Sequence, residues 1–165
     1  MNLRSEALSR DGYIIDQRQT ENIPFGAESS NVNGCGWIAA YNFLKAMDRE
    51  IDPEQLLCNL EKTLLFRGRL GVNLFCLVRE LKKQRLPLDF SLGYFHAQCL
   101  SERCRAGIIL YFTGKRNHFA AFRREADGRL RFFGAVPGKD RDMQTMAEFY
   151  RDHVKFPLAV TITAR

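Results

Sequence analysis

The sequence predicts one α+β domain in which helices come first and an antiparallel sheet follows. The chain has 165 residues, a length typical of a single domain. Apolar residues recur at helical spacing up to Pro87, and beyond it they form strand-sized blocks separated by turn residues. Helices followed by strands, without alternation, are typical of the α+β class. We therefore expect a single domain over residues 1–165, with an arm or loop at 1–33, a helical part at 34–86 and a mainly β part at 87–165.

The first predicted helix begins at Cys35, after a polar segment that ends in Asn33 and Gly34. Asn and Gly are both favoured at the residue that precedes a helix. From there on, apolar residues recur three or four positions apart, as one face of a helix requires. The residues of this face are Trp37, Ala40, Tyr41, Leu44 and Met47. We expect this face to pack in the core.

Two further helices are predicted before Pro87. Asp52 can cap the first of them, Pro53 suits its first position, and Gln55 completes a D-x-x-Q variant of the capping box. The other begins near Asn73 and stops before Pro87, because the residue before a proline disfavours helical geometry.

Beyond Pro87 the pattern predicts an antiparallel sheet. The expected strands cover residues 88–92, 106–113, 118–124, 129–133 and 158–163. A short helix is expected at 143–152, and the segment around His96 is expected to be irregular.

Charge and hydropathy exclude several classes of function. The chain carries 25 Lys and Arg against 19 Asp and Glu, a net charge of +6, but has no basic run of the kind that binds nucleic acid. No apolar run approaches the roughly 18–20 residues of a membrane span. Residues 1–16 lack the apolar core of a signal peptide, so we expect a cytoplasmic protein.

The five cysteines are expected to be reduced thiols, because their number is odd and no export signal is found. They contain no C-x-x-C pair, and His96, Cys99 and Cys104 lack a fourth ligand for zinc. No phosphate-binding loop of the correct spacing is present. We therefore expect no metal and no cofactor.

Cys35 stands in a setting that suits a nucleophile. It lies at the first turn of an apolar helix, between Gly34 and Gly36. The backbone N–H groups there carry partial positive charge, which favours the thiolate and could stabilise an oxyanion. The glycines leave room for a substrate backbone to approach the sulfur. The alternative is a helix that simply begins with a buried cysteine.

A thiol nucleophile needs a base, and His118 is the strongest candidate. It opens a predicted strand directly after the polar loop 114–117, and a strand end beside a loop is a rigid, partly open position. His96 and His153 are expected to be surface or half-buried residues. Taken alone, His118 could equally be structural, but a helix-start Cys and a strand-start His strengthen each other.

Together these segments resemble the papain-like cysteine peptidases, and most closely the bacterial branch that processes bacteriocin leader peptides. The resemblance rests on the Cys35-Gly-Trp-x-Ala-Ala segment after an Asn-rich loop and on the later His118-Phe pair, within roughly residues 30 to 140. It implies a helical subdomain that carries Cys35, an antiparallel sheet that carries His118, and an active cleft between them.

The sequence departs from that family at two positions. The Asp or Asn that normally orients the histidine is replaced by Gly134 or Ala135, so a backbone carbonyl or a water would have to hold the ring. The Gln that normally stabilises the oxyanion is replaced by Ser29. Asn31 is then the candidate donor, with Asn33 and the more distant Gln19 as substitutes.

The predicted function is hydrolysis of a peptide or amide bond through a Cys35–His118 dyad and a thioester intermediate. An inactive peptide-binding module of the same fold is one alternative, because no side chain can hold the imidazole. An acyltransferase that uses the same two residues is another. The expected partner is a peptide or an acyl donor, and neither its identity nor the oligomeric state follows from the sequence.

Overall fold

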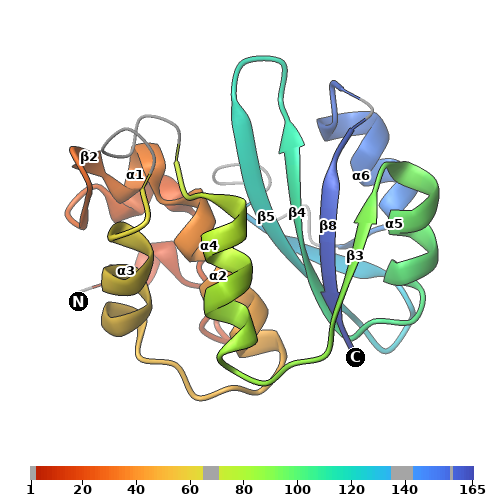
Figure 1. Cartoon of the computed structure of the whole chain (residues 1–165), viewed down its shortest axis with the longest axis horizontal. Helices are drawn as coiled ribbons and strands as arrows, with labels where there is room; N and C mark the ends of the chain where they lie inside the picture. The colour runs from red at the N-terminus through yellow and green to blue at the C-terminus, as the bar shows by residue number, and fades with distance from the viewer. Residues whose placement is uncertain (1–2, 65–70, 135–142, 157) are drawn as a thin grey trace.

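The computed structural model describes residues 3–64, 71–134, 143–156 and 158–165. A helical half and a sheet half lie side by side in Figure 1, and two more helices cover the outer face of the sheet. The α+β fold predicted from the sequence is confirmed, with the helices first and the antiparallel sheet second.

The helical half begins with short elements and continues into three longer helices. The short elements are the 3-10 helices η1 (Ser5–Ala7) and η2 (Gln17–Thr20), strands β1 (Pro24–Phe25) and β2 (Glu28–Ser29), and helix α1 (Ser30–Asn33). The longer helices are α2 (Cys35–Ala46), α3 (Pro53–Glu61) and α4 (Leu74–Lys82).

The predicted starts of these helices are largely correct. Helix α2 begins at Cys35, and Asp52 and Asn73 cap α3 and α4 by accepting from the backbone N–H groups of Glu54 and Phe75. These bonds satisfy donors that have no partner inside the helix. One start differs from the prediction. Helix α2 follows α1 directly with no side-chain cap, since Gly34 continues the helical backbone.

The predicted capping box of α3 is also wrong. The amide of Gln55 donates to Asn59 one turn further along the helix. The i, i+4 pairing available on the exposed helix surface therefore takes the side chain away from the cap.

The sheet half begins after Pro87. Its strands are β3 (Leu88–Leu92), β4 (Ala106–Phe112), β5 (Asn117–Arg124), β6 (Leu130–Phe133), β7 (Met143–Gln144) and β8 (Val160–Ala164). Within the described residues they form an antiparallel sheet in the order β3-β8-β4-β5-β6-β7. Its two helices are α5 (Tyr94–Ser101) and α6 (Met146–His153), where Thr145 and Glu148 form a capping box.

Helix α5 corrects the expectation of an irregular segment around His96. It begins after Gly93, which has a φ of 78° and no side chain to cap the helix. Its apolar residues are not confined to one face, because Phe95 is exposed while Ala97 is buried. Neither of the usual helix signals is therefore present in the sequence.

Two apolar clusters cover the two faces of the sheet. The larger one contains the buried face of α2, including Trp37 and Phe43, together with sheet residues such as Ile108 and Phe119. The smaller one lies under α5 and α6 and includes Phe122 and Phe149. Helix α2 packs on the strand that carries His118, so the core fixes the helix start relative to that strand.

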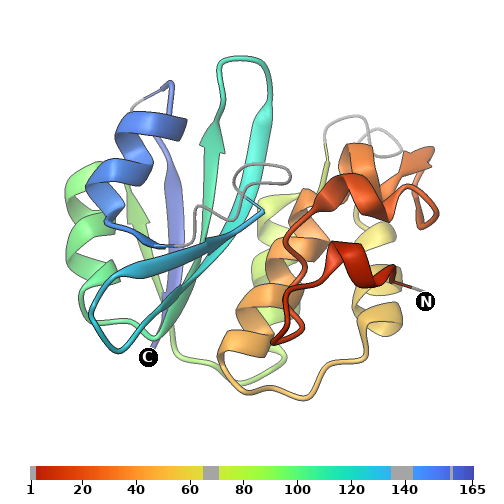
Figure 2. The same ribbon diagram turned by 180° about the vertical axis from the view of Figure 1, so that it is seen from behind.

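The N-terminal arm joins the two halves on the side shown in Figure 2. The ring of Tyr13 stacks on Phe133 of β6, with centroids 4.2 Å apart. The buried amide of Asn42 on α2 accepts from the N–H of Ile14 at 2.9 Å and donates to its carbonyl at 2.8 Å. The arm thereby contacts both α2 and the sheet.

Candidate active site

The turn before Cys35 is packed too tightly for any side chain at position 34. A Cβ on Gly34 would lie 2.3 Å from the carbonyl oxygen of Ser30 and 2.9 Å from Nε1 of Trp37. That indole nitrogen donates to the hydroxyl of Ser30 at 3.0 Å. Cys35 therefore projects from a turn that its neighbours hold in place, and its own side chain is half-buried.

Gly36 allows a second close approach at the start of α2. A Cβ on Gly36 would lie 2.7 Å from Cβ and Cγ2 of Val72, closer than real Cβ contacts come. Val72 is buried, and its backbone forms a bridge with Leu64. Glycine at this position thus lets the segment that precedes α4 pack on the first turn of α2.

Cys35 and His118 lie near one another in the structure. His118 is the second residue of β5 and is buried, with 7% of its surface exposed. Its imidazole lies close enough to the thiol of Cys35 for each group to shift the pKa of the other. The helix start and the strand start, 83 residues apart in the sequence, therefore meet at one place.

The two groups shift each other's ionisation in opposite directions. Burial alone would raise the pKa of the Cys35 thiol, but the neighbouring imidazolium of His118, the N–H of Phe119 and the charge of Arg116 together lower that pKa below its ordinary 9.0. Burial alone would lower the pKa of His118, but the neighbouring Cys35 and the bond to the carbonyl of Gly134 raise it above 6.5. Both shifts favour the thiolate–imidazolium pair.

The other side of the imidazole is held by the backbone. Nε2 of His118 lies 2.7 Å from the carbonyl oxygen of Gly134, directly after β6. A carbonyl oxygen can only accept, so Nε2 carries the hydrogen and Nδ1 is left for the thiol. The ring of Tyr111 on β4 meets the imidazole edge to face at 5.7 Å. A backbone carbonyl holding the ring was one of the two expectations for position 134, and Ala135 lies outside the described residues.

Asn31, the expected oxyanion donor, lies half-buried in α1 on the turn before Cys35. Its side-chain oxygen accepts a short hydrogen bond from the hydroxyl of Ser29. That bond orients the amide so that its N–H₂ end faces away from Ser29. The side-chain nitrogen of Asn33 is buried and has no hydrogen-bond partner.

The sequence did not point to Gln17, the residue that holds this turn from the arm. Its side-chain amide donates to the carbonyl oxygens of Ser30 at 3.0 Å and Asn31 at 3.1 Å. Gln19, two residues further on, is the residue of this segment that the sequence suggested, as a substitute oxyanion donor. Asp16 caps η2 by accepting from the N–H of Arg18.

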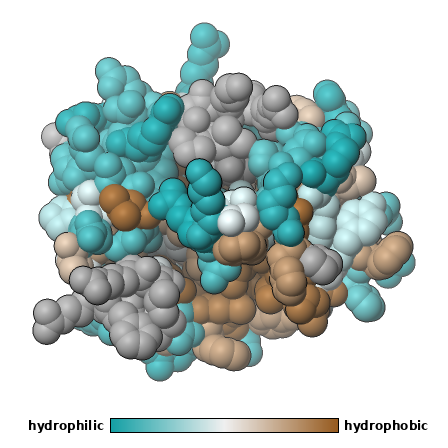
Figure 3. Space-filling view, turned by 90° about the horizontal axis from the view of Figure 1, so that it is seen from above, coloured by the Kyte–Doolittle hydropathy of each residue, from teal (hydrophilic) through white to brown (hydrophobic). Residues whose placement is uncertain are grey.

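Several apolar side chains are exposed on the sheet half of the molecule. Phe112 of β4 is partly exposed and pairs with Asn117, the residue before His118. Phe90 and Leu92 on β3, and Leu158 just before β8, are exposed as well. Figure 3, a view onto the upper end of the molecule, shows such apolar side chains gathered on one side of this face.

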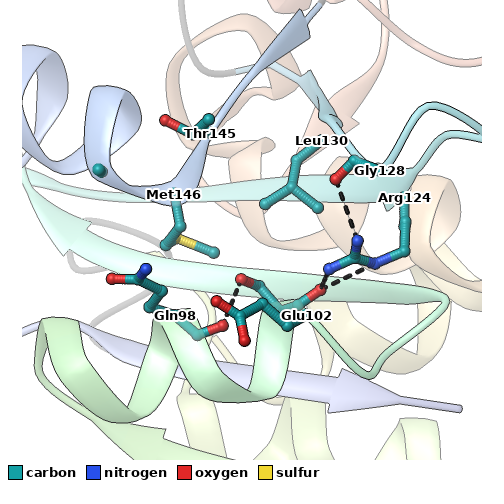
Figure 4. Close-up of a pocket in the computed structure, with 9 residues that line it drawn as sticks. Gln98, Glu102, Arg124, Gly128, Leu130, Thr145 and Met146 are labelled. Atoms are coloured by element: carbon teal, nitrogen blue, oxygen red, sulfur yellow. Dashed lines mark hydrogen bonds between the residues drawn. The ribbon is translucent and has the colours of Figure 1, made fainter.

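A separate cavity of about 210 Å³ lies on the other side of the sheet, between α5, α6 and the β5–β6 hairpin (Figure 4). Arg124 lines it and donates to the carbonyl oxygens of Ser101 and Gly128. These bonds tie the end of α5 to the hairpin. The cavity is lined by neither Cys35 nor His118.

Among the residues that the structure describes, no group of three or more His, Cys, Asp or Glu could hold a metal ion. None of their helices is both long enough and apolar enough to cross a membrane.

The sequence matches no protein-family model and no curated protein. The fold does match solved structures. The peptidase domain of Streptococcus ComA, a bifunctional ABC transporter involved in quorum sensing, gives a TM-score of 0.58 at 13% identity, over 81% of this chain and 93% of that chain. A double-glycine-motif protease from an AMS/PCAT transporter, solved with its leader peptide, gives 0.50 at 15% identity, over 79% of this chain and 84% of that chain. This chain therefore has the papain-like fold of double-glycine peptidase domains.

Proposed function

We propose that this protein is a cysteine peptidase with Cys35 as nucleophile and His118 as general base and then general acid. The observation that carries the proposal is the position of a half-buried thiol at a helix start beside a buried imidazole whose Nε2 lies 2.7 Å from the carbonyl oxygen of Gly134. A thiol beside an imidazole whose other nitrogen is already held is the arrangement that activates sulfur for attack on a carbonyl.

The reaction follows from the two protonation states. The thiol proton passes to Nδ1 of His118, and the thiolate sulfur attacks the substrate carbonyl carbon, whose oxygen becomes an oxyanion. When the intermediate collapses, the C–N bond breaks and the imidazolium gives its proton to the leaving amine. The remaining thioester on Cys35 is hydrolysed by water, which His118 deprotonates. The sulfur and the imidazole then return to their starting states.

The oxyanion needs donors at the position where its charge develops. We assign this role to the backbone N–H of Cys35 and to the side-chain amide of Asn31. Asn31 supports the assignment because its oxygen is already bonded to Ser29, so the group left for a ligand is the donor end. The Gln17 amide holds the carbonyl oxygens of this turn and so keeps Asn31 beside the helix start.

A peptide is the substrate class that the surroundings of the site support best. Exposed apolar side chains lie at Phe112, which pairs with the first residue of β5, at Leu158 just before β8, and at Phe90 and Leu92 on β3. Exposed apolar surface of this kind commonly marks an interaction site. A neighbour of this fold was solved with a leader peptide, so we take a peptide with a double-glycine motif as the first substrate to test.

Cleavage of such peptides, followed by mass spectrometry, tests the proposal. The wild-type protein should cut the substrate peptide at one bond. Cys35→Ala should abolish turnover while leaving the protein folded. Cys58→Ala, at an exposed cysteine on α3, is the matched control and should cut normally. Unchanged turnover by Cys35→Ala would reject the assignment.

The two alternatives give different products in the same assay. An acyltransferase would transfer the acyl group to an added amine in preference to water. A binding module would retain the peptide without cutting it, and Cys35→Ala would then bind as well as the wild type.

A further inference from the structure

Gly134 occupies the place where a side chain would be expected to orient the catalytic histidine. It is the first residue after β6, with a φ of 75°, and its carbonyl oxygen lies 2.7 Å from Nε2 of His118. This backbone oxygen therefore stands where the carboxylate or amide of an Asp or Asn would hold the ring.

We propose that the backbone carbonyl of Gly134 is the positioning group for His118, so that the site works as a triad whose third member is a main-chain oxygen. This inference rests on the proposed function. It assigns to Gly134 the role that an Asp or Asn side chain fills in related sites, which is to fix the tautomer and the orientation of the ring.

A neutral carbonyl differs from a carboxylate in one chemical respect. It fixes the Nε2–H tautomer in the neutral ring and still accepts the same hydrogen when the ring is charged. It carries no full charge, so it stabilises the imidazolium less than a carboxylate would. In this site the charge of the imidazolium is therefore balanced mainly by the Cys35 thiolate.

The position of that oxygen depends on the backbone conformation of Gly134. A φ of 75° lies in the left-handed region that glycine adopts readily, asparagine less readily and β-branched residues rarely. No atom lies within 4 Å of the place where a Cβ would stand. Position 134 thus favours glycine because of its positive φ, since there is space for a side chain. A substitution should therefore move the carbonyl oxygen without causing a clash.

Paired substitutions test the inference. Gly134→Val disfavours the left-handed conformation, whereas Gly134→Asn tolerates it. Gly128→Val is the matched control, because Gly128 has a φ of 83° in the turn beyond the far end of β5 from His118. The readouts are the alkylation rate of Cys35 by iodoacetamide against pH, and NMR of the imidazole nitrogens of His118.

We expect Gly134→Val to slow alkylation of Cys35 at pH 7 about tenfold or more and to lower the pKa of His118, by loss of the group that orients the ring. Gly134→Asn should retain most of the rate, and Gly128→Val should retain all of it. In the wild type the neutral ring should carry its hydrogen on Nε2.

A neutral ring protonated on Nδ1, or an unchanged pH profile in Gly134→Val, would overturn this inference and leave the proposed function standing. A different outcome would reject the proposed function itself. A wild-type Cys35 that reacts no faster than Cys58 would reject the proposed function, whatever the tautomer of His118. The tautomer is measured on the wild type, so the inference remains testable even where Gly134→Val fails to fold.

Discussion

At the residue scale the proposed site consists of two side chains and one backbone oxygen. Cys35 and His118 can be proposed from the sequence, because a thiol between glycines at a helix start and an imidazole at a strand start are recognisable by residue type. The Gly134 carbonyl could be expected only in general terms, since every residue has a carbonyl and its direction is set by φ and ψ. Gln17 could not be predicted, because its effect passes through the backbone of α1.

The pH dependence of turnover follows from the two ionisations. As pH rises, Cys35 loses its proton below the ordinary 9.0 and His118 keeps its proton above the ordinary 6.5. We expect kcat/KM to rise on the acid side as the thiolate–imidazolium pair forms and to fall on the alkaline side as the imidazolium loses its proton. The two apparent pKa values belong to the pair. A rate that only rises, following an ordinary thiol through pH 9, would contradict this.

At the element scale the start of α2 sets the position of the nucleophile. The sequence predicted this start, as well as α3 and α4, because cap residues and apolar spacing are local signals. Helix α5 was missed because it has neither signal, and its stability comes from packing against β3 and α6. The contact of Gly36 with Val72 was likewise invisible in the sequence, since it joins segments with no shared pattern.

Gly36→Ala tests this packing. In an open helix, Gly to Ala stabilises by roughly 0.5–1 kcal/mol. Here the new Cβ would stand 2.7 Å from Val72, so we expect a fall of about 1–3 kcal/mol in the free energy of unfolding. Val72→Ala added to Gly36→Ala should recover part of that loss. Denaturant unfolding of the single and double variants measures the coupling, and additive effects would show that the two residues do not share this contact.

At the scale of the whole molecule, the arm holds the helical half against the sheet half. The sequence predicted the α+β fold class, the order of helices and sheet, and most strands. These features follow from the spacing of apolar residues and from the positions of turn residues. The course of residues 1–33 was not, because its contacts are long-range: the Tyr13–Phe133 stack and the bonds of Asn42 with Ile14.

Asn42→Ala should therefore weaken the whole fold. It leaves the buried N–H and carbonyl of Ile14 without their partner, which costs about 2–4 kcal/mol and lowers Tm by roughly 5–15 °C. Asn59→Ala is the control, because Asn59 is half-buried and bonds with the exposed Gln55 and the half-buried Glu80. Thermal unfolding followed by circular dichroism compares the two. Equal, small shifts would mean that the arm contributes little to stability.

The most direct measurement is the alkylation rate of Cys35 relative to Cys58 at pH 7, mapped by mass spectrometry in the wild type and in His118→Gln. Cys58 is exposed and Cys35 is half-buried, so accessibility alone would make Cys35 the slower thiol. Activation by His118 predicts that Cys35 reacts faster, by about tenfold or more, and that the excess disappears in His118→Gln. A Cys35 that reacts no faster than Cys58 in the wild type, or equally fast without His118, would contradict the assignment of these two residues as nucleophile and base.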